Sequence, residues 1–176
     1  MTLSDKQCGV LKGMTAGVIA TFAVLIAALV LRPVSIPPEA AAGERIAFAL
    51  KVDAVLALFL AWSVGRLARH RFFAPDDIDG GGLAQGTHHA RVLQSTLQNT
   101  LEQTVLAVLT HVIWSVAMPA SWMSVVPAAA VLFVCGRVLF VRGYEGGAPS
   151  RALGFAITFY PSVLMLVLIT VHLVFR

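Results

Sequence analysis

Five long runs of residues limit what this chain can fold into. The first run, Gly13–Leu31, contains no charged side chain over nineteen residues. At about 1.5 Å per residue, a helix of this length crosses the roughly 30 Å of hydrocarbon in a bilayer, and it exceeds the apolar core of a usual signal peptide. Four further runs of spanning length occupy residues 46–65, 87–117, 122–141 and 152–175. We therefore expect an all-α integral membrane protein, a helix bundle of five transmembrane spans.

The composition and the charge pattern agree with this fold class. Hydrophobic residues make up 58% of the 176 positions and charged residues 12%, whereas soluble domains carry about 25% charged residues. A net charge of +4 could indicate nucleic-acid binding, but the basic side chains stand mainly at the ends of the apolar runs. Membrane topology explains that placement better, so we expect no nucleic-acid partner.

Five spans place successive connectors on opposite sides of the membrane. One side receives nine basic residues and the other receives three. Since cytoplasmic flanks carry the excess of Lys and Arg, the N-terminus is predicted to lie in the cytoplasm and the C-terminus outside. This topology puts Asn99, Glu102, Tyr144 and Arg151 toward the cytoplasmic half.

The third run carries a carboxylate, Glu102, at the head of an apolar stretch. At 3.6 residues per turn, Ser95, Gln98 and Asn99 lie on the same side of the helix as Glu102. An ionisable side chain inside a span normally faces a partner, so one interpretation pairs Glu102 with Arg137, deep in the fourth run, as a structural ion pair. The other interpretation places Glu102 at headgroup level, where water solvates it.

His111 is the ionisable side chain in the middle of the third run. A proton carrier and a metal ligand are the functional interpretations of such a residue. Because no second ligand stands at helical spacing on the same run, we prefer an interior histidine satisfied by a neighbour, and we expect no metal site.

Three stretches in the same order resemble one family. Residues 62–77, WSVGRLARHRFFAPDD, look like the end of the first helix and the following loop of the MAPEG superfamily, the membrane-associated proteins in eicosanoid and glutathione metabolism. The sequence Asn99-Thr-Leu-Glu102 resembles the Asn-x-x-Glu motif of its second helix. Residues 136–151 are similar to its third-helix end and following loop, including the seven-residue step from Tyr144 to Arg151.

The resemblance implies a domain organisation and a set of partners. Residues 46–176 would form a four-helix MAPEG-like membrane domain, and residues 1–45 an extra N-terminal transmembrane helix and loop. The family implies a homotrimer in membrane lipid, here expected in a bacterial inner membrane. Its active sites would lie between neighbouring subunits and would take glutathione as co-substrate from the cytosol and a lipophilic small molecule from the bilayer.

The same resemblance assigns roles to five residues. Arg66, Asn99, Glu102, Tyr144 and Arg151 would hold glutathione, and Arg151 would stand near the sulfur as the catalytic residue. Glutathione carries two carboxylates and one ammonium, which guanidinium groups and a carboxylate respectively bind well. A nearby arginine also favours the reactive thiolate. Without the family pattern, the simpler interpretation is that Arg66 and Arg151 are charges flanking the membrane spans and that Tyr144 is an aromatic residue at the membrane interface.

Two positions depart from the family pattern. Many family enzymes carry an arginine four residues before the Asn and an aromatic hydroxyl four residues before the Tyr, where this chain has Ser95 and Phe140. Arg91, one further turn back, is a substitute cation. The leading hypothesis is a membrane-embedded glutathione-dependent transferase or peroxidase acting on a lipophilic electrophile. The alternative is a non-catalytic MAPEG-like protein that binds lipid or a partner.

Overall fold

The computed structural model describes residues 3–175, and five long helices dominate this part of the chain. They are α1 (Asp5–Leu31), α2 (Ala42–Phe73), α3 (His88–Ala117), α4 (Val125–Gly143) and α5 (Ala148–Val174). Two short 3₁₀ helices, Pro75–Asp77 and Ala120–Trp122, lie in the connectors. By length and composition, each of the five spans is long and apolar enough to cross a membrane. The predicted all-α architecture with five spans is confirmed.

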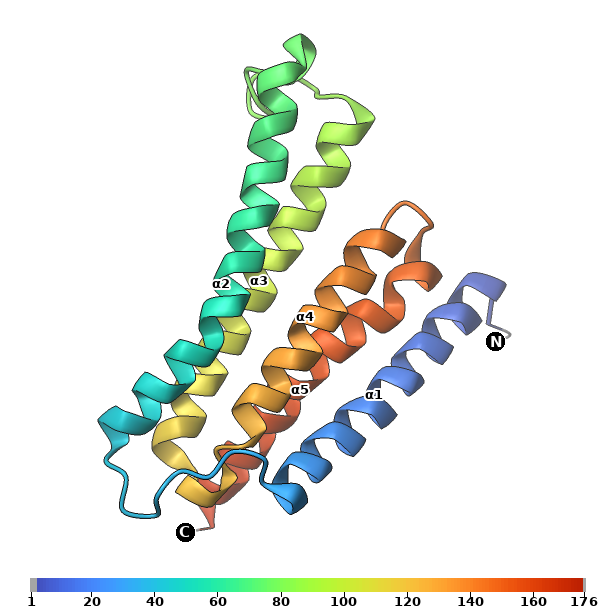
Figure 1. The fold of residues 1–176 in the computed structure, drawn as a ribbon. Coiled ribbons are helices and arrows are strands. Elements are labelled where there is room, and N and C mark those ends of the chain that lie inside the picture. Colours follow the sequence, from blue (N-terminus) through green and yellow to red (C-terminus); the bar gives the residue numbers. More distant parts are fainter. Residues whose placement is uncertain (1–2, 176) are drawn as a thin grey trace.

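The helices run alternately up and down, so the start of α1, the α2–α3 connector and the α4–α5 connector share one side (Figure 1). We call this the N-terminal side. Helix α5 packs against α1 and α4, whereas α2 packs mainly against α3, and α3 also contacts α5.

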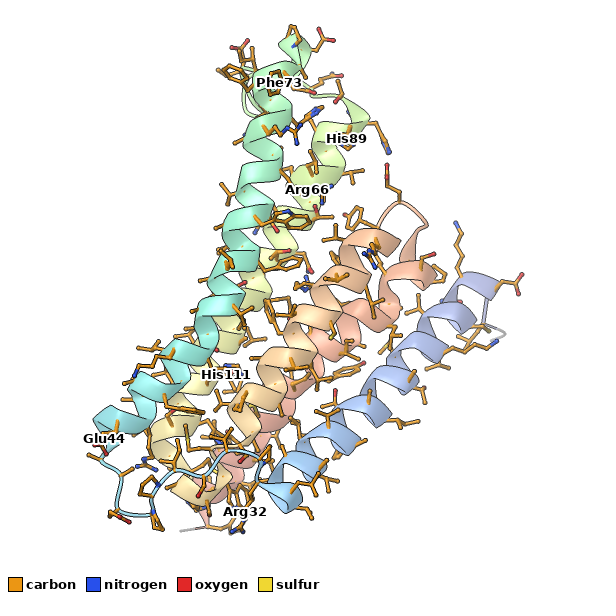
Figure 2. All side chains as sticks on the ribbon, in the orientation of Figure 1. Arg32, Glu44, Arg66, Phe73, His89 and His111 are labelled. Carbon is orange, nitrogen blue, oxygen red and sulfur yellow. The ribbon has the colours of Figure 1, made fainter. Side chains whose placement is uncertain are left out.

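Helices α2 and α3 project beyond the other helices on the N-terminal side (Figure 1). Helix α2 has 32 residues and is therefore about 48 Å long, more than the roughly 30 Å of hydrocarbon it has to cross. Arg66, Phe73 and His89 lie on this projecting part, and His111 lies in the opposite half of the bundle (Figure 2).

The connectors are shorter than the hydrophobic pattern predicts. A polar connector is expected from Arg66 onward, whereas α2 continues through Phe73. Arg, Leu and Ala are good helix formers in water, so the helix stops only before Pro75, whose ring disfavours helical geometry at the residue ahead of it. Helix α5 likewise begins at Ala148 because Pro149 is tolerated in a first turn.

The largest buried apolar cluster lies on the side opposite the N-terminal side. Trp114, Met123 and Met165, from α3, the α3–α4 connector and α5, are fully buried there. The Trp114 indole N–H donates to the Trp122 carbonyl at 3.2 Å. Arg45 Nη1 donates to the carbonyl of Met118 at 2.8 Å. These contacts hold the helices together at the end away from the projecting part of α2 and α3.

Helix α1 docks along α5 through small residues. Gly9, Gly13 and Gly17 face α5, and a Cβ added at Gly13 would lie 2.8 Å from the Cβ of Ala152. A Cβ at Gly17 would clash with Ala156. Small residues of this kind let two helix backbones approach closely in a membrane. The extra N-terminal helix is therefore packed against the bundle along three successive turns.

Candidate functional site

Arg137 is fully buried in α4 and connects α4 to two other helices. Its Nη1 donates to Asn99 Oδ1 of α3 at 2.8 Å, and its Nε donates to Thr158 Oγ1 of α5 at 3.2 Å. Its Nη2 has no hydrogen-bond partner among residues 3–175. The guanidinium thus positions Asn99 at the junction of α3, α4 and α5.

Within one chain, the structure does not bring Arg137 to Glu102, the partner that one of the two interpretations gave it. No ion pair joins Arg137 and Glu102 in the part of the chain that the structure describes. Glu102 lies one turn beyond Asn99 on an exposed face of α3, where it accepts a hydrogen bond from Gln98 Nε2 at 2.9 Å. A helix turns about 100° per residue, so two residues three apart differ by roughly 60° in direction, enough to turn Glu102 away from α4.

Two aromatic rings lie in contact between two arginines, from Arg137 toward the α4–α5 connector. Arg137 Cζ lies 4.5 Å from the ring centroid of Phe140, whose ring meets that of Tyr144 edge to face at 5.5 Å. Arg151 Cζ lies 4.3 Å from the Tyr144 ring centroid. Each cation–ring contact contributes about 0.5–2 kcal/mol, depending on how dry the site is. We call these four residues the arginine–aromatic column. With Asn99 at its far end, it joins three of the five residues predicted to hold glutathione, Asn99, Tyr144 and Arg151.

An apolar pocket of about 430 Å³ adjoins Arg151. Helix α1 contributes Val10 and Met14 to it, and Phe140 comes from α4. The lining from α5 consists of Ala148, Arg151, Ala152, Phe155, Phe159 and Tyr160. We call it the α1–α5 pocket. Among residues 3–175, Arg151 is the one charged residue that lines it, so this side chain stands between the column and a site for an apolar molecule.

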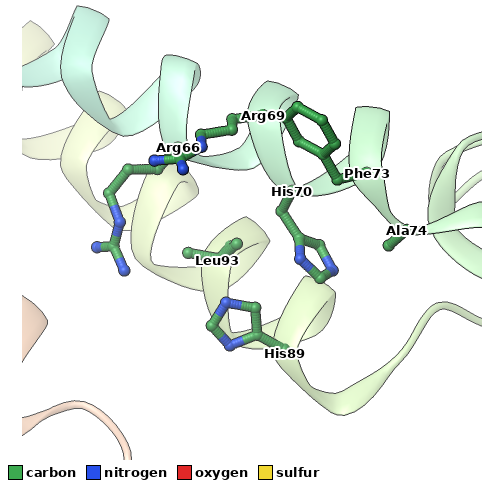
Figure 3. A pocket seen from close by; sticks show the side chains of 7 residues that line it. All are labelled: Arg66, Arg69, His70, Phe73, Ala74, His89 and Leu93. Atoms are coloured by element: carbon green, nitrogen blue, oxygen red, sulfur yellow. The ribbon is translucent and has the colours of Figure 1, made fainter.

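Arg66 lies apart from the column, on the projecting part of α2. Its guanidinium covers the Trp62 ring at 4.8 Å and lines a pocket of about 490 Å³ between α2 and α3 (Figure 3). The other lining residues are Arg69, His70, Phe73, Ala74, His89 and Leu93. Two arginines and two histidines, with no carboxylate among the lining residues, make this pocket suited to an anion. We call it the α2–α3 pocket.

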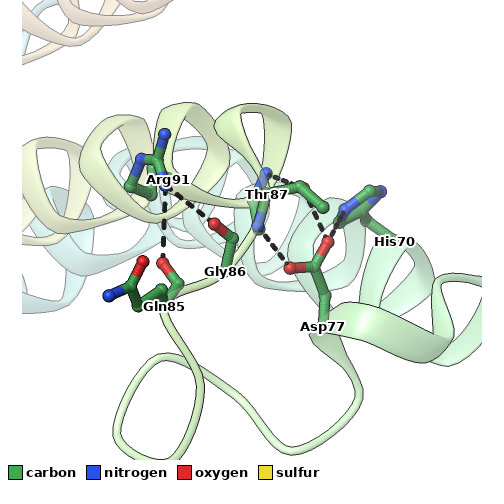
Figure 4. Close-up of polar contacts among 7 residues, drawn as sticks. His70, Asp77, Gln85, Gly86, Thr87 and Arg91 are labelled. Carbon is green, nitrogen blue, oxygen red and sulfur yellow. Dashed lines mark hydrogen bonds and ion pairs between the residues drawn. The ribbon is translucent and has the colours of Figure 1, made fainter.

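A buried carboxylate orients one of these histidines. Asp77 accepts hydrogen bonds from the backbone N–H and the hydroxyl of Thr87, both at 2.7 Å, and its Oδ2 lies 2.7 Å from His70 Nε2 (Figure 4). The hydrogen bonds from Thr87 are the largest cause that lowers the pKa of Asp77 to about 2 from an ordinary 3.8, and His70 adds to this effect. The motifs in the sequence do not predict this cluster; its visible signals there are Asp77 shortly after Pro75 and Thr87 as the residue that caps α3.

The lowered pKa of Asp77 predicts an acid-sensitive connector. A carboxylate whose pKa is depressed on folding stabilises the protein above its unfolded pKa, and that contribution is lost as the pH falls through the folded pKa. Wild-type protein should therefore melt higher than Asp77→Asn at pH 7, and the difference should shrink between about pH 4 and pH 2. Thermal melts in detergent measure this, with Asp76→Asn, which alters an exposed carboxylate, as the control. A constant difference across this range would contradict the assignment.

The two positions that depart from the family pattern, Ser95 and Phe140, have different surroundings in the structure. Ser95 is exposed on α3. Arg91, its candidate substitute, donates from Nη1 to the Gly86 carbonyl at 2.7 Å and so holds the α2–α3 connector. Phe140 is buried and carries no hydroxyl, but its ring supports Arg137.

His111 is satisfied inside the bundle. Its Nδ1 lies 2.6 Å from Oδ1 of Asp53 on α2, and both side chains are buried. This agrees with the preferred interpretation of an interior histidine with a neighbouring partner. Within residues 3–175, no group of three or more His, Cys, Asp or Glu side chains is arranged to hold a metal ion.

Comparison with known proteins gives one family match. The family model described as the MAPEG family matches residues 46–171. The matched segment contains all the predicted site residues, Arg66, Asn99, Glu102, Arg137, Tyr144 and Arg151, and it begins after α1. No curated protein and no solved structure matches the chain significantly.

Proposed function

Because this chain belongs to the MAPEG family, we propose that it is a membrane-embedded glutathione-dependent transferase or peroxidase acting on a lipophilic electrophile. The observation that carries the proposal is the position of Arg151. Its guanidinium covers Tyr144 at the end of the arginine–aromatic column and also lines the apolar α1–α5 pocket. A charged reactant and an apolar reactant can therefore meet at one side chain.

Arg151 has the chemistry that a thiol reaction needs. A thiol has a reference pKa of about 8.5, and a neighbouring arginine favours the thiolate form that attacks electrophiles. An electrophile held in the α1–α5 pocket would be presented to that sulfur, so two reactants would combine as if in one molecule. In a conjugation, the thiolate sulfur forms a bond to the electrophilic carbon, and the displaced electron pair leaves with the leaving group or is protonated.

We further propose that the site is completed by a neighbouring copy in a homotrimer. Glu102 is exposed on a spanning helix, and a charge facing lipid near the bilayer centre costs roughly 3 kcal/mol. Leu101 and Val105, beside it, are 41% and 50% exposed. An apolar face with one carboxylate suits protein better than lipid, and packing it against a second copy would bring Glu102 to a partner.

The N-terminal side is the proposed entrance for glutathione. The α2–α3 pocket and Arg151 both lie toward this side, which the distribution of basic residues assigns to the cytoplasm. In an assembly, Arg66 would bind a carboxylate of the tripeptide and Glu102 its ammonium. Asn99 and Tyr144 would bind its amide groups.

Calorimetry with glutathione on the detergent-solubilised protein tests the proposal. We expect saturable binding to the wild type and binding weakened about tenfold or more by Glu102→Gln, since a lost charged hydrogen bond costs about 1.5–3 kcal/mol. The control is Glu145→Gln, which removes an exposed carboxylate from the α4–α5 connector on the same side. A folded wild type that binds no glutathione would overturn the proposal.

One observation favours the alternative, a non-catalytic protein that binds lipid or a partner. Ser95 and Phe140 replace a cation and a hydroxyl of the family pattern, and the Phe140 ring, which packs against Arg137, brings no hydrogen-bonding group to the pocket beside Arg151. Lipid retained stoichiometrically by a protein that binds no glutathione would support that function.

A further inference from the structure

Helix α1 lies outside the segment matched to the MAPEG family, yet it forms one wall of the pocket beside Arg151. The two residues it contributes, Val10 and Met14, are four apart and therefore share one face of the helix. The neighbouring small residues Gly9 and Gly13 pack directly on α5 and hold that face in place. The position of this wall is thus set by the docking of α1.

The groove between α1 and α5 continues past the α1–α5 pocket. A second cavity of about 170 Å³ follows it and shares Tyr160 with it. Its other lining residues are Val18, Thr21 and Phe22 of α1 and Val163, Leu164 and Val167 of α5. From Arg151 to Val167, the two cavities follow α5 for sixteen residue steps, roughly 24 Å.

Thr21 gives the second cavity an unpartnered polar atom. Its side chain is 1% exposed, and its Oγ1 has no hydrogen-bond partner among residues 3–175. Thr100, Thr104 and Thr110 on α3 all donate to the carbonyl four residues earlier, the usual arrangement for a threonine in a helix. The hydroxyl of Thr21, unlike these, is left without a partner in the wall of the second cavity.

We propose that α1 is the wall that selects the substrate, and that the groove between α1 and α5 binds an elongated lipophile with an anionic head at Arg151. The guanidinium supplies the charge that recognises the head, and the apolar lining holds the body. Rings in that lining, such as Phe155 stacked on Phe159 at 5.4 Å, offer flat faces to it. Met14 sets the width of the groove, and its flexible side chain adapts to the ligand. The identity of this ligand as a reactant rests on the proposed function, whereas its binding does not.

The test uses cis-parinaric acid, a fluorescent elongated fatty acid, with the full-length protein in detergent and without glutathione. We expect Met14→Trp, which fills the α1–α5 pocket, to weaken binding at least about tenfold, the loss typical of an overfilled site. Leu11→Trp is the matched control, because Leu11 is on the same helix but does not line the pocket. The methyl ester, which lacks the charge, should bind at least about tenfold more weakly than the acid.

Three outcomes would overturn the inference. They are equal binding by wild type and Met14→Trp, an equal loss in Leu11→Trp, and equal binding of acid and ester, which would indicate an ordinary lipid chain in the groove. If Met14→Trp does not fold, Val10→Phe fills the α1–α5 pocket from the same face of α1, and we expect it to weaken binding in the same way. Selective binding of the acid by a protein that binds no glutathione would support this inference and overturn only the proposed function.

Discussion

Gly154→Val is expected to destabilise the folded protein by about 3 kcal/mol or more, the upper range for overpacking a tight interface. Helices α4 and α5 touch through Gly136 and Gly154, and a Cβ at Gly154 would clash with the backbone nitrogen of Phe140 and lie 2.8 Å from the Gly136 carbonyl oxygen. Backbone atoms cannot rotate away, so the two helices would have to separate along their length. Close packing makes that separation costly.

The same separation would disturb the candidate site. Thr158 Oγ1 accepts the hydrogen bond from Arg137 Nε and donates to the Gly154 carbonyl at 2.8 Å. Moving α5 away from α4 would therefore release one of the two groups that hold Arg137. The arginine–aromatic column would lose its fixed position along with the stability of the bundle.

Thermal or denaturant unfolding in detergent measures this effect. The matched control is Gly65→Val, since Gly65 also lies inside a helix, α2, and a Cβ there meets no atom of another element within 4 Å. Both variants change helix propensity equally, so the difference between them isolates the α4–α5 contact. Equal stability of the two variants would show that the close approach of α4 and α5 is not required.

The spans and the order of the motifs could be predicted because their signals are local. A run such as Gly13–Leu31 has only one way to satisfy its backbone in a bilayer. Tyr144 and Arg151 stand seven residues apart around one short connector, so their proximity needs little knowledge of the rest of the fold. Arg151 over Tyr144 at 4.3 Å agrees with that expectation.

The contacts between distant segments could not be predicted in the same way. Asn99 and Glu102 share a side of α3 in the sequence pattern, and only the rotation of α3 against α4 decides which one meets Arg137. Asp77 is likewise ten residues from Thr87 across a glycine-rich connector whose path the sequence does not specify. The wall that α1 forms beside Arg151 depends on which helix it docks against.

If glutathione binds with its thiolate beside Arg151, as proposed above, Arg151→Ala is expected to remove most of that thiolate. At pH 7, only a few per cent of a thiol with a pKa near 8.5 is ionised, and an opposite charge within about 4–6 Å lowers such a pKa by roughly 1–3 units. Loss of Arg151 should therefore reduce the bound thiolate about tenfold or more at neutral pH. Arg142→Ala, which removes an exposed arginine at the end of α4, is the control.

The ultraviolet absorbance of the thiolate, measured when glutathione is added to detergent-solubilised protein, tests this claim most directly. We expect a saturable thiolate signal in wild type and in Arg142→Ala that persists to a lower pH than that of free glutathione. In Arg151→Ala, this signal should be largely lost. A wild type that binds glutathione only as the thiol, or an Arg151→Ala variant with the full thiolate signal, would contradict the claim.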